Sequence, residues 1–298
     1  MQTTFEGIWV PIVTPLRDGA IDHPALTRLA QHLAASGIAG LVAGATTGEG
    51  ALLGEDEHEA LFATLRKAVP TLPVVLGISH ASTHAAVAQA KRLASLRPDG
   101  LLVTAPTYVR PSQQGVQRHF ETLAEAADTP LLIYNIPYRS GVNVELETLQ
   151  ALARDPRVVG VKECGGSTDR LLRLVHETPL RILSGDDNQN FAALCLGAHG
   201  TIAASAHVLP ERHVQLWQRL RHGDLAAARR IAVQLAPMVR ALFAEPNPAP
   251  LKAWLAQQGW CSDEVRLPFV PASGQLRRQL QTEWEALQSV PHTVMAPA

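Results

Sequence analysis

Cysteine is scarce in this chain, and its positions show no pairing pattern. The 298 residues contain only Cys164, Cys195 and Cys261, which lie far apart, form no CxxC pair and have no histidine nearby at metal-ligand spacing. Disulfide-rich secreted domains and structural zinc sites both depend on clustered cysteines. We therefore expect neither a disulfide framework nor a metal site, and we expect a reducing cytoplasm as the location.

An excess of one charge sign and long apolar runs are also missing. The formal net charge is −1, and no long run of either sign occurs. Because nucleic acids and membrane surfaces bind concentrated basic faces, we expect neither partner. No apolar run approaches the roughly 20 residues that cross a bilayer. The N-terminal MQTTFEGIWV lacks the basic and apolar regions of a signal peptide, so the sequence predicts a soluble protein.

The chain does contain a series of short apolar runs separated by amphipathic stretches. The runs have strand length and begin at Gly7, Gly40, Pro73, Gly100, Pro130, Val158, Arg181 and His199. Between them lie helical patterns, as in residues 23–36, where Leu26, Leu29 and Leu33 recur at three- and four-residue steps. Three of the helical stretches are preceded by serine, a preferred helix-start residue, at Ser82, Ser112 and Ser167.

This alternation predicts an α/β fold. Strands that alternate with helices pair in parallel, and eight such units predict a (β/α)8 TIM barrel. A doubly wound open sheet is the alternative. After His207, helical patterns follow one another with no intervening strand. We assign residues 1–223 to a catalytic barrel and residues 224–298 to a C-terminal helical extension packed against it.

Polar residues gather where the predicted strands end, which is the active face of such a barrel. They comprise hydroxyl, tyrosine, arginine and lysine side chains at Thr46, Thr47, Tyr108, Arg110, Tyr134, Arg139 and Lys162. The glycine-rich GATTGEG, residues 44–50, lacks the spacing of a dinucleotide fingerprint, and no GK[ST] follows. We expect this turn to hold a small anion rather than a nucleotide.

In RVVGVKECGG, residues 157–166, Lys162 directly follows an apolar run whose β-branched valines predict a buried strand. A surface lysine at a strand end is the ordinary alternative. A buried position would disfavour the ammonium and favour the free amine, which attacks a ketone to form a Schiff base. Tyr134 is the candidate proton shuttle and Arg139 the candidate carboxylate ligand, against the alternatives of a structural tyrosine and a solvated arginine.

Several motifs together resemble one family. YNIPYRSG, residues 134–141, and GVKECGG, residues 160–166, resemble the N-acetylneuraminate lyase and dihydrodipicolinate synthase superfamily of pyruvate-dependent class I aldolases. GATTGEG, APTYVRPS, LSGDDN, GTIAASA and EPNPAPLK occur in the expected order, so the resemblance covers nearly the whole chain. The arginine of YNIPYRSG and the EPNPAPLK segment point to the dihydrodipicolinate synthase branch, since sialic acid lyases usually lack that arginine.

The resemblance implies roles for the residues at the centre of the reaction. Lys162 would form an imine with pyruvate, and Tyr134 would relay protons. Thr46 would link Tyr134 to Tyr108, which in this family is typically lent to the site of the neighbouring subunit. Thr47 and its backbone amide would hold the pyruvate carboxylate.

For the second substrate, the resemblance implies that Arg139 binds the carboxylate of aspartate semialdehyde at the entrance. Backbone groups near Gly185 and Ile202 would help to line the pocket. The product would be 4-hydroxy-tetrahydrodipicolinate, in lysine and diaminopimelate biosynthesis, with no metal or organic cofactor. Members of the family are commonly homotetramers built as a pair of tight dimers.

Two alternative functions remain open at this point. The first is another pyruvate-dependent aldolase or dehydratase of the same superfamily that acts on a sugar acid. The second is a non-catalytic barrel that serves as a binding protein. The intact set of Lys162, Tyr134, Thr46, Tyr108 and Arg139 argues against the second, because a binding protein has no need of a nucleophile together with its proton relay.

One departure from the family concerns feedback regulation. Lysine-inhibited members bind lysine in a cleft lined by histidine, asparagine, glutamate and tyrosine side chains. The aligned positions here are Glu55, Ala81, Ala85 and Thr107, and only His58 is retained. Because the partner for the lysine ammonium is lost, the sequence predicts weak or absent inhibition by lysine.

Overall fold

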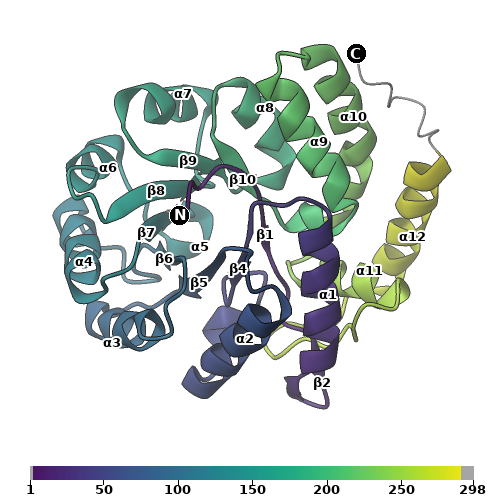
Figure 1. Ribbon diagram of the computed structural model, residues 1–298, viewed down its shortest axis with the longest axis horizontal. Helices are drawn as coiled ribbons and strands as arrows, with labels where there is room; N and C mark the ends of the chain where they lie inside the picture. Colours follow the sequence, from purple (N-terminus) through teal and green to yellow (C-terminus); the bar gives the residue numbers. More distant parts are fainter. Residues whose placement is uncertain (1–2, 290–298) are drawn as a thin grey trace.

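The chain forms a closed barrel of eight parallel strands (Figure 1). This computed structural model describes residues 3–289. The barrel strands are β1 (Gly7–Pro11), β4 (Gly40–Ala43), β5 (Val74–Ile78), β6 (Gly100–Thr104), β7 (Leu131–Asn135), β8 (Val158–Glu163), β9 (Arg181–Ser184) and β10 (Gly200–Ile202). Each strand pairs with the next along the chain, and β1 pairs with β10 to close the barrel. The predicted TIM barrel is confirmed, and the open-sheet alternative is wrong.

A small antiparallel ribbon of β2 (Leu16–Arg17) and β3 (Ala20–Ile21) lies between β1 and the first helix. Two-residue strands are too short to produce a periodic pattern, so the sequence did not predict them.

Helices separate the strands, and three of them begin where the sequence placed their start signals. The serine oxygens of Ser82, Ser112 and Ser167 accept backbone N–H groups of the following turns, which satisfies donors left free at a helix start. The helices between barrel strands are α1 (His23–Ala35), α2 (Glu55–Ala68), α3 (Thr83–Ala94), α4 (Gln113–Ala126), α5 (Pro137–Ser140), α6 (Leu146–Leu152), α7 (Thr168–Glu177) and α8 (Asn190–Cys195). Single turns η1 (Gly50–Leu52), η2 (Asp187–Gln189) and η3 (Ala204–His207) follow three of the strands.

The barrel strands are buried on both faces, in two separate apolar clusters. Inside the barrel, Trp9, Leu102 and Leu132 pack with one another and with the interior face of Tyr134. A larger cluster fills the space between strands and helices, and includes the apolar stripe predicted for α1. Because both faces are buried, a parallel strand leaves room for polar side chains mainly at its ends.

Four helices follow the last barrel strand: α9 (Pro210–Arg221), α10 (Leu225–Leu242), α11 (Ala249–Gln257) and α12 (Gly274–Ser289). The last three lie beside α9 and α1 on one flank of the barrel (Figure 1). The ring of Trp260 stacks on that of His32 in α1, with centroids 4.4 Å apart, and Arg266 donates to the Glu57 carboxylate of α2 over 2.7 Å. The division at residues 223 and 224 stays a prediction, and residues 290–298 of the predicted extension lie outside the described residues.

No helix within residues 3–289 combines the length and the apolar character that a membrane crossing requires.

Candidate active site

Lys162 lies at the end of β8 with its side chain inside the barrel. It pairs in register with Tyr134 of β7, it is only 5% exposed, and its Nζ lies 4.3 Å from the centroid of the Tyr134 ring. The next residue, Glu163, faces the opposite side of the strand, where its carboxylate accepts hydrogen bonds from Asn135 over 2.9 Å and Arg170 over 3.1 Å. The strand can therefore end on two ionisable residues, because Lys162 faces the barrel interior and Glu163 has hydrogen-bond partners on the opposite face.

Gly185, at the end of β9, makes room for the lysine side chain. A Cβ atom added at this position would lie 2.4 Å from Cε of Lys162 and 2.4 Å from Sγ of Cys164, so a larger residue here would displace these side chains. Burial raises the pKa of the Cys164 thiol to about 12, so this neighbour of the amine is a neutral thiol at physiological pH.

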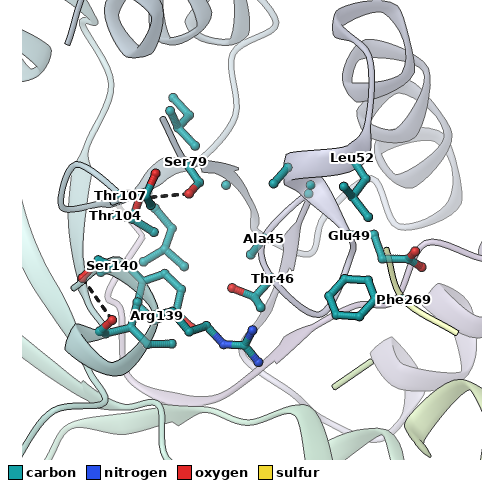
Figure 2. Close-up of a pocket in the computed structure, with 18 of the residues that line it drawn as sticks. Ala45, Thr46, Glu49, Leu52, Ser79, Thr104, Thr107, Arg139, Ser140 and Phe269 are labelled. Carbon is teal, nitrogen blue, oxygen red and sulfur yellow. Dashed lines mark hydrogen bonds between the residues drawn. The ribbon is translucent and has the colours of Figure 1, made fainter. Parts of the chain in front are cut away.

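Tyr134 is held as a neutral phenol. Burial raises its pKa well above the usual value, and a hydrogen bond with Thr46 acts in the opposite direction. A protonated phenol beside a lysine amine can donate a proton to an oxygen that forms next to that amine. Thr46 belongs to the turn after β4, and Arg139 lies on α5 with an exposed side chain. In Figure 2 the side chain of Arg139 extends from the left of the view and ends below Thr46.

The structure brings seven of the eight predicted site residues to one cavity of about 370 Å³. These residues are Thr46, Thr47, Tyr134, Arg139, Lys162, Gly185 and Ile202. Such a volume suits a small molecule, and the mixture of one amine, two phenols (Tyr134 and Tyr138) and two threonine hydroxyl groups suits a polar one.

A second cavity of about 240 Å³ adjoins the first and is drawn in Figure 2. It shares Thr46, Tyr134 and Arg139 with the first cavity and extends to Thr107 and Phe269.

Tyr108 is the one predicted residue that lines neither cavity. Its side chain is 90% exposed, and its backbone has φ +72°, a conformation that is uncommon for a residue other than glycine. Within one copy of the chain, Tyr108 therefore stands apart from the other seven residues.

Sequence reasoning missed several residues that line the larger cavity, notably Asp187, Phe243 and Asn247. Burial raises the pKa of Asp187, against the effect of its hydrogen bonds with Ser205, whose backbone N–H donates to Asp187 Oδ1 over 2.6 Å. The motif after the seventh predicted strand, SGDDN, was the signal for Asp187. Asn247 lies in EPNPAPLK, a segment that indicates the family but carries no local signal for a role of this asparagine.

Within residues 3–289, no three His, Cys, Asp or Glu side chains form a group that could hold a metal ion. The side chains of the cavity itself offer an amine, a phenol that can donate a proton and an arginine that can bind anions.

Comparison with known proteins agrees with this geometry. The Dihydrodipicolinate synthetase family model matches residues 4–287. The 4-hydroxy-tetrahydrodipicolinate synthase of Thermosynechococcus vestitus is 38% identical over 285 residues, which cover 94% of this chain and 96% of that protein. The synthase structure from Methylacidiphilum fumariolicum superimposes with a TM-score of 0.93 at 35% identity, covering 96% of each chain. A lysine-bound structure of the Cyanidioschyzon merolae enzyme gives 0.92 at 32% identity, covering 95% of this chain and 98% of that one. The chain therefore belongs to the dihydrodipicolinate synthetase family.

Proposed function

We propose that this chain is a Schiff-base-forming lyase that condenses pyruvate with L-aspartate 4-semialdehyde to give 4-hydroxy-tetrahydrodipicolinate, in lysine and diaminopimelate biosynthesis. The observation that carries this proposal is the buried Lys162 beside Tyr134 in a cavity that also contains Arg139. The printed names of the relatives support the choice of substrates.

The first half of the reaction forms the covalent intermediate. The Lys162 amine attacks the ketone carbon of pyruvate to give a carbinolamine. Tyr134 protonates the carbinolamine hydroxyl, which leaves as water, and an imine forms. The imine nitrogen then withdraws electrons, so that the methyl group loses a proton and becomes a nucleophilic enamine carbon.

The second half joins the substrates and releases the enzyme. The enamine carbon attacks the aldehyde of the semialdehyde, and the amine of that substrate then attacks the imine carbon. Ring closure expels the Lys162 amine, which returns to its starting state. Because the imine nitrogen is itself the electron sink, the mechanism requires neither a metal nor an organic cofactor.

Two groups of donors select anionic substrates. Thr47, with its hydroxyl and backbone amide, binds the pyruvate carboxylate deep in the cavity, and backbone groups near Gly185 and Ile202 line the pocket there. Arg139 is exposed and binds the carboxylate of the semialdehyde at the entrance through its planar pair of donors.

The proposal includes a cytoplasmic homotetramer, arranged as a dimer of dimers, in which Tyr108 serves the neighbouring copy. Two observations support the shared tyrosine. Tyr108 is almost fully exposed in the single chain, and Thr46 and Tyr134 line a second cavity of about 240 Å³.

Borohydride reduction with pyruvate, followed by mass analysis of peptides, tests the mechanism. We expect a pyruvyl adduct on the peptide that carries Lys162, and its absence would remove the mechanism. Steady-state rates with aspartate semialdehyde and with sugar-acid substrates then test which second substrate the enzyme uses. Turnover of the sugar acids alone would refute the semialdehyde and favour the other branch of the superfamily.

We predict weak or absent inhibition of this enzyme by lysine. Glu55, Ala85, Ser79 and His80 line a cavity of about 390 Å³ beside the GATTGEG turn, and the Glu55 carboxylate is already paired with Arg92. No carboxylate at position 85 remains to pair with a lysine ammonium. Isothermal titration with lysine should show no binding in the micromolar range, and millimolar lysine should leave the initial rate unchanged. A micromolar dissociation constant would contradict this prediction.

A further inference from the structure

One buried hydrogen bond connects the carboxylate-binding turn to the C-terminal helices. The side-chain amide of Asn247, Nδ2, donates to Oγ1 of Thr47 over 3.0 Å. Asn247 lies between α10 and α11 and is 7% exposed, and Thr47 is 4% exposed. Both residues line the cavity that contains Lys162. A residue 200 positions away in the sequence therefore contacts one of the hydroxyl groups of the site.

The backbone of the turn is fixed by other contacts. Thr14 donates from its hydroxyl to the carbonyl oxygen of Gly48 over 2.7 Å. The carboxylate of Glu49 pairs with the ammonium of Lys252 on α11, and both side chains are fully buried. Since these contacts hold the turn on two sides, Asn247 is not required to position its backbone. Its contribution concerns the direction of the Thr47 hydroxyl.

A threonine hydroxyl carries one proton to donate and two lone pairs that accept. Because the Asn247 amide occupies a lone pair of Thr47, the hydroxyl proton is free to point toward a different acceptor. Within the cavity, the acceptor that the proposed reaction provides is the carboxylate of the oxo acid. Hydrogen bonds to such charged acceptors contribute more than those between neutral groups.

We propose that Asn247 is a positioning residue that orients the Thr47 hydroxyl to donate to the carboxylate of the oxo acid bound at Lys162. This inference rests on the proposed function, because it requires a 2-oxo acid in the cavity. It assigns part of the oxo-acid specificity to the segment before α11 rather than to the barrel alone.

The variant Asn247→Asp tests the inference by replacing a donor with an acceptor of similar shape. The new carboxylate would accept the hydrogen bond of the Thr47 hydroxyl, which would then no longer point at the substrate. It would also place a second negative charge beside the substrate carboxylate. We expect the pyruvate concentration that gives half-maximal borohydride trapping to rise at least about tenfold at pH 8, which corresponds to about 1.4 kcal/mol. Trapping at saturating pyruvate should remain close to that of the unchanged chain, because Lys162 and Tyr134 are intact.

The pH dependence separates this role from a purely structural one. When pH falls far enough to protonate the introduced aspartic acid, its O–H can donate to Thr47, and the half-saturating concentration should return toward that of the unchanged chain. Asn188→Asp adds the same charge at an exposed position outside this cavity and serves as the matched control, with an expected change below about twofold. Thermal melts of all variants verify that each is folded.

A double-variant comparison shows whether Asn247 acts through the hydroxyl. Asn247→Ala should raise the half-saturating pyruvate concentration several-fold when Thr47 is present. In a chain that already carries Thr47→Val, the same substitution should raise it by less than about twofold. An Asn247→Asp variant with unchanged half-saturation, in a chain that traps pyruvate normally, overturns the inference and leaves the proposed function intact. An unchanged chain that traps no pyruvate overturns both.

Discussion

Replacing Lys162 with methionine or alanine is expected to abolish the pyruvyl adduct and to lower kcat by at least about ten-thousandfold. Removal of the nucleophile from an enzyme that works through a covalent intermediate removes the whole pathway, and losses of this order or larger are typical. The remaining cavity can still bind pyruvate, but without the imine nitrogen nothing withdraws electrons from the methyl carbon.

The fold should survive the Lys162 substitution. The side chain lies against the ring of Tyr134 and beside Gly185, and no ion pair of Lys162 is lost when it is replaced. Methionine keeps an unbranched chain of similar length and is the better-matched variant. Circular dichroism and thermal unfolding should therefore resemble those of the unchanged chain, while mass analysis after borohydride shows no adduct.

An adduct that persists on another lysine would contradict this assignment. Lys252 is the other buried lysine among residues 3–289, but its ammonium pairs with Glu49 and donates to the carbonyl oxygen of Glu264 over 2.7 Å. An amine held in this way is not available as a nucleophile. The peptide that carries Lys252 should therefore remain unmodified in both proteins.

The barrel could be predicted because its signals are local. Each strand is buried on both faces and appears as a short apolar run, and serine marked the starts of α3, α4 and α7. Lys162 was identifiable for the same reason, since a charged residue at the end of an apolar run conflicts with its surroundings. Such conflicts are expected at functional sites.

The contacts of the C-terminal helices with the site could not be predicted in this way. Asn247 and Thr47, like Lys252 and Glu49, are about 200 residues apart, and no periodic pattern relates positions that meet only after folding. Asp187 was visible in its motif, but its hydrogen bond with Ser205 of η3 joins residues 18 positions apart. Tyr108 is exposed in the single chain, and no local sequence pattern signals a contact between two copies.

The largest expected effect on stability concerns the buried pair of Glu49 and Lys252. Both side chains are fully buried, and Glu49 is also bonded to the backbone N–H of Arg266 over 2.8 Å. Lys252→Met removes the only cation that pairs with this carboxylate within residues 3–289. Breaking such a pair leaves an uncompensated buried charge and typically costs about 3–5 kcal/mol. We expect urea unfolding of Lys252→Met to shift to lower denaturant by a corresponding amount.

The double variant Glu49→Gln with Lys252→Met distinguishes an uncompensated charge from lost packing. The glutamine is neutral and can still accept from the Arg266 N–H. Adding Glu49→Gln to Lys252→Met should therefore recover a large part of the stability that Lys252→Met loses. As a matched control, Arg173→Met breaks the exposed pair of Arg173 and Glu177 on α7 and should leave the unfolding midpoint essentially unchanged. If the double variant were less stable than Lys252→Met alone, the loss would come from the shape of the lysine side chain, and the carboxylate would not need a cation. Recovery would instead mean that charge compensation, acting between α11 and the turn after β4, holds the C-terminal helices to the substrate-binding end of the barrel.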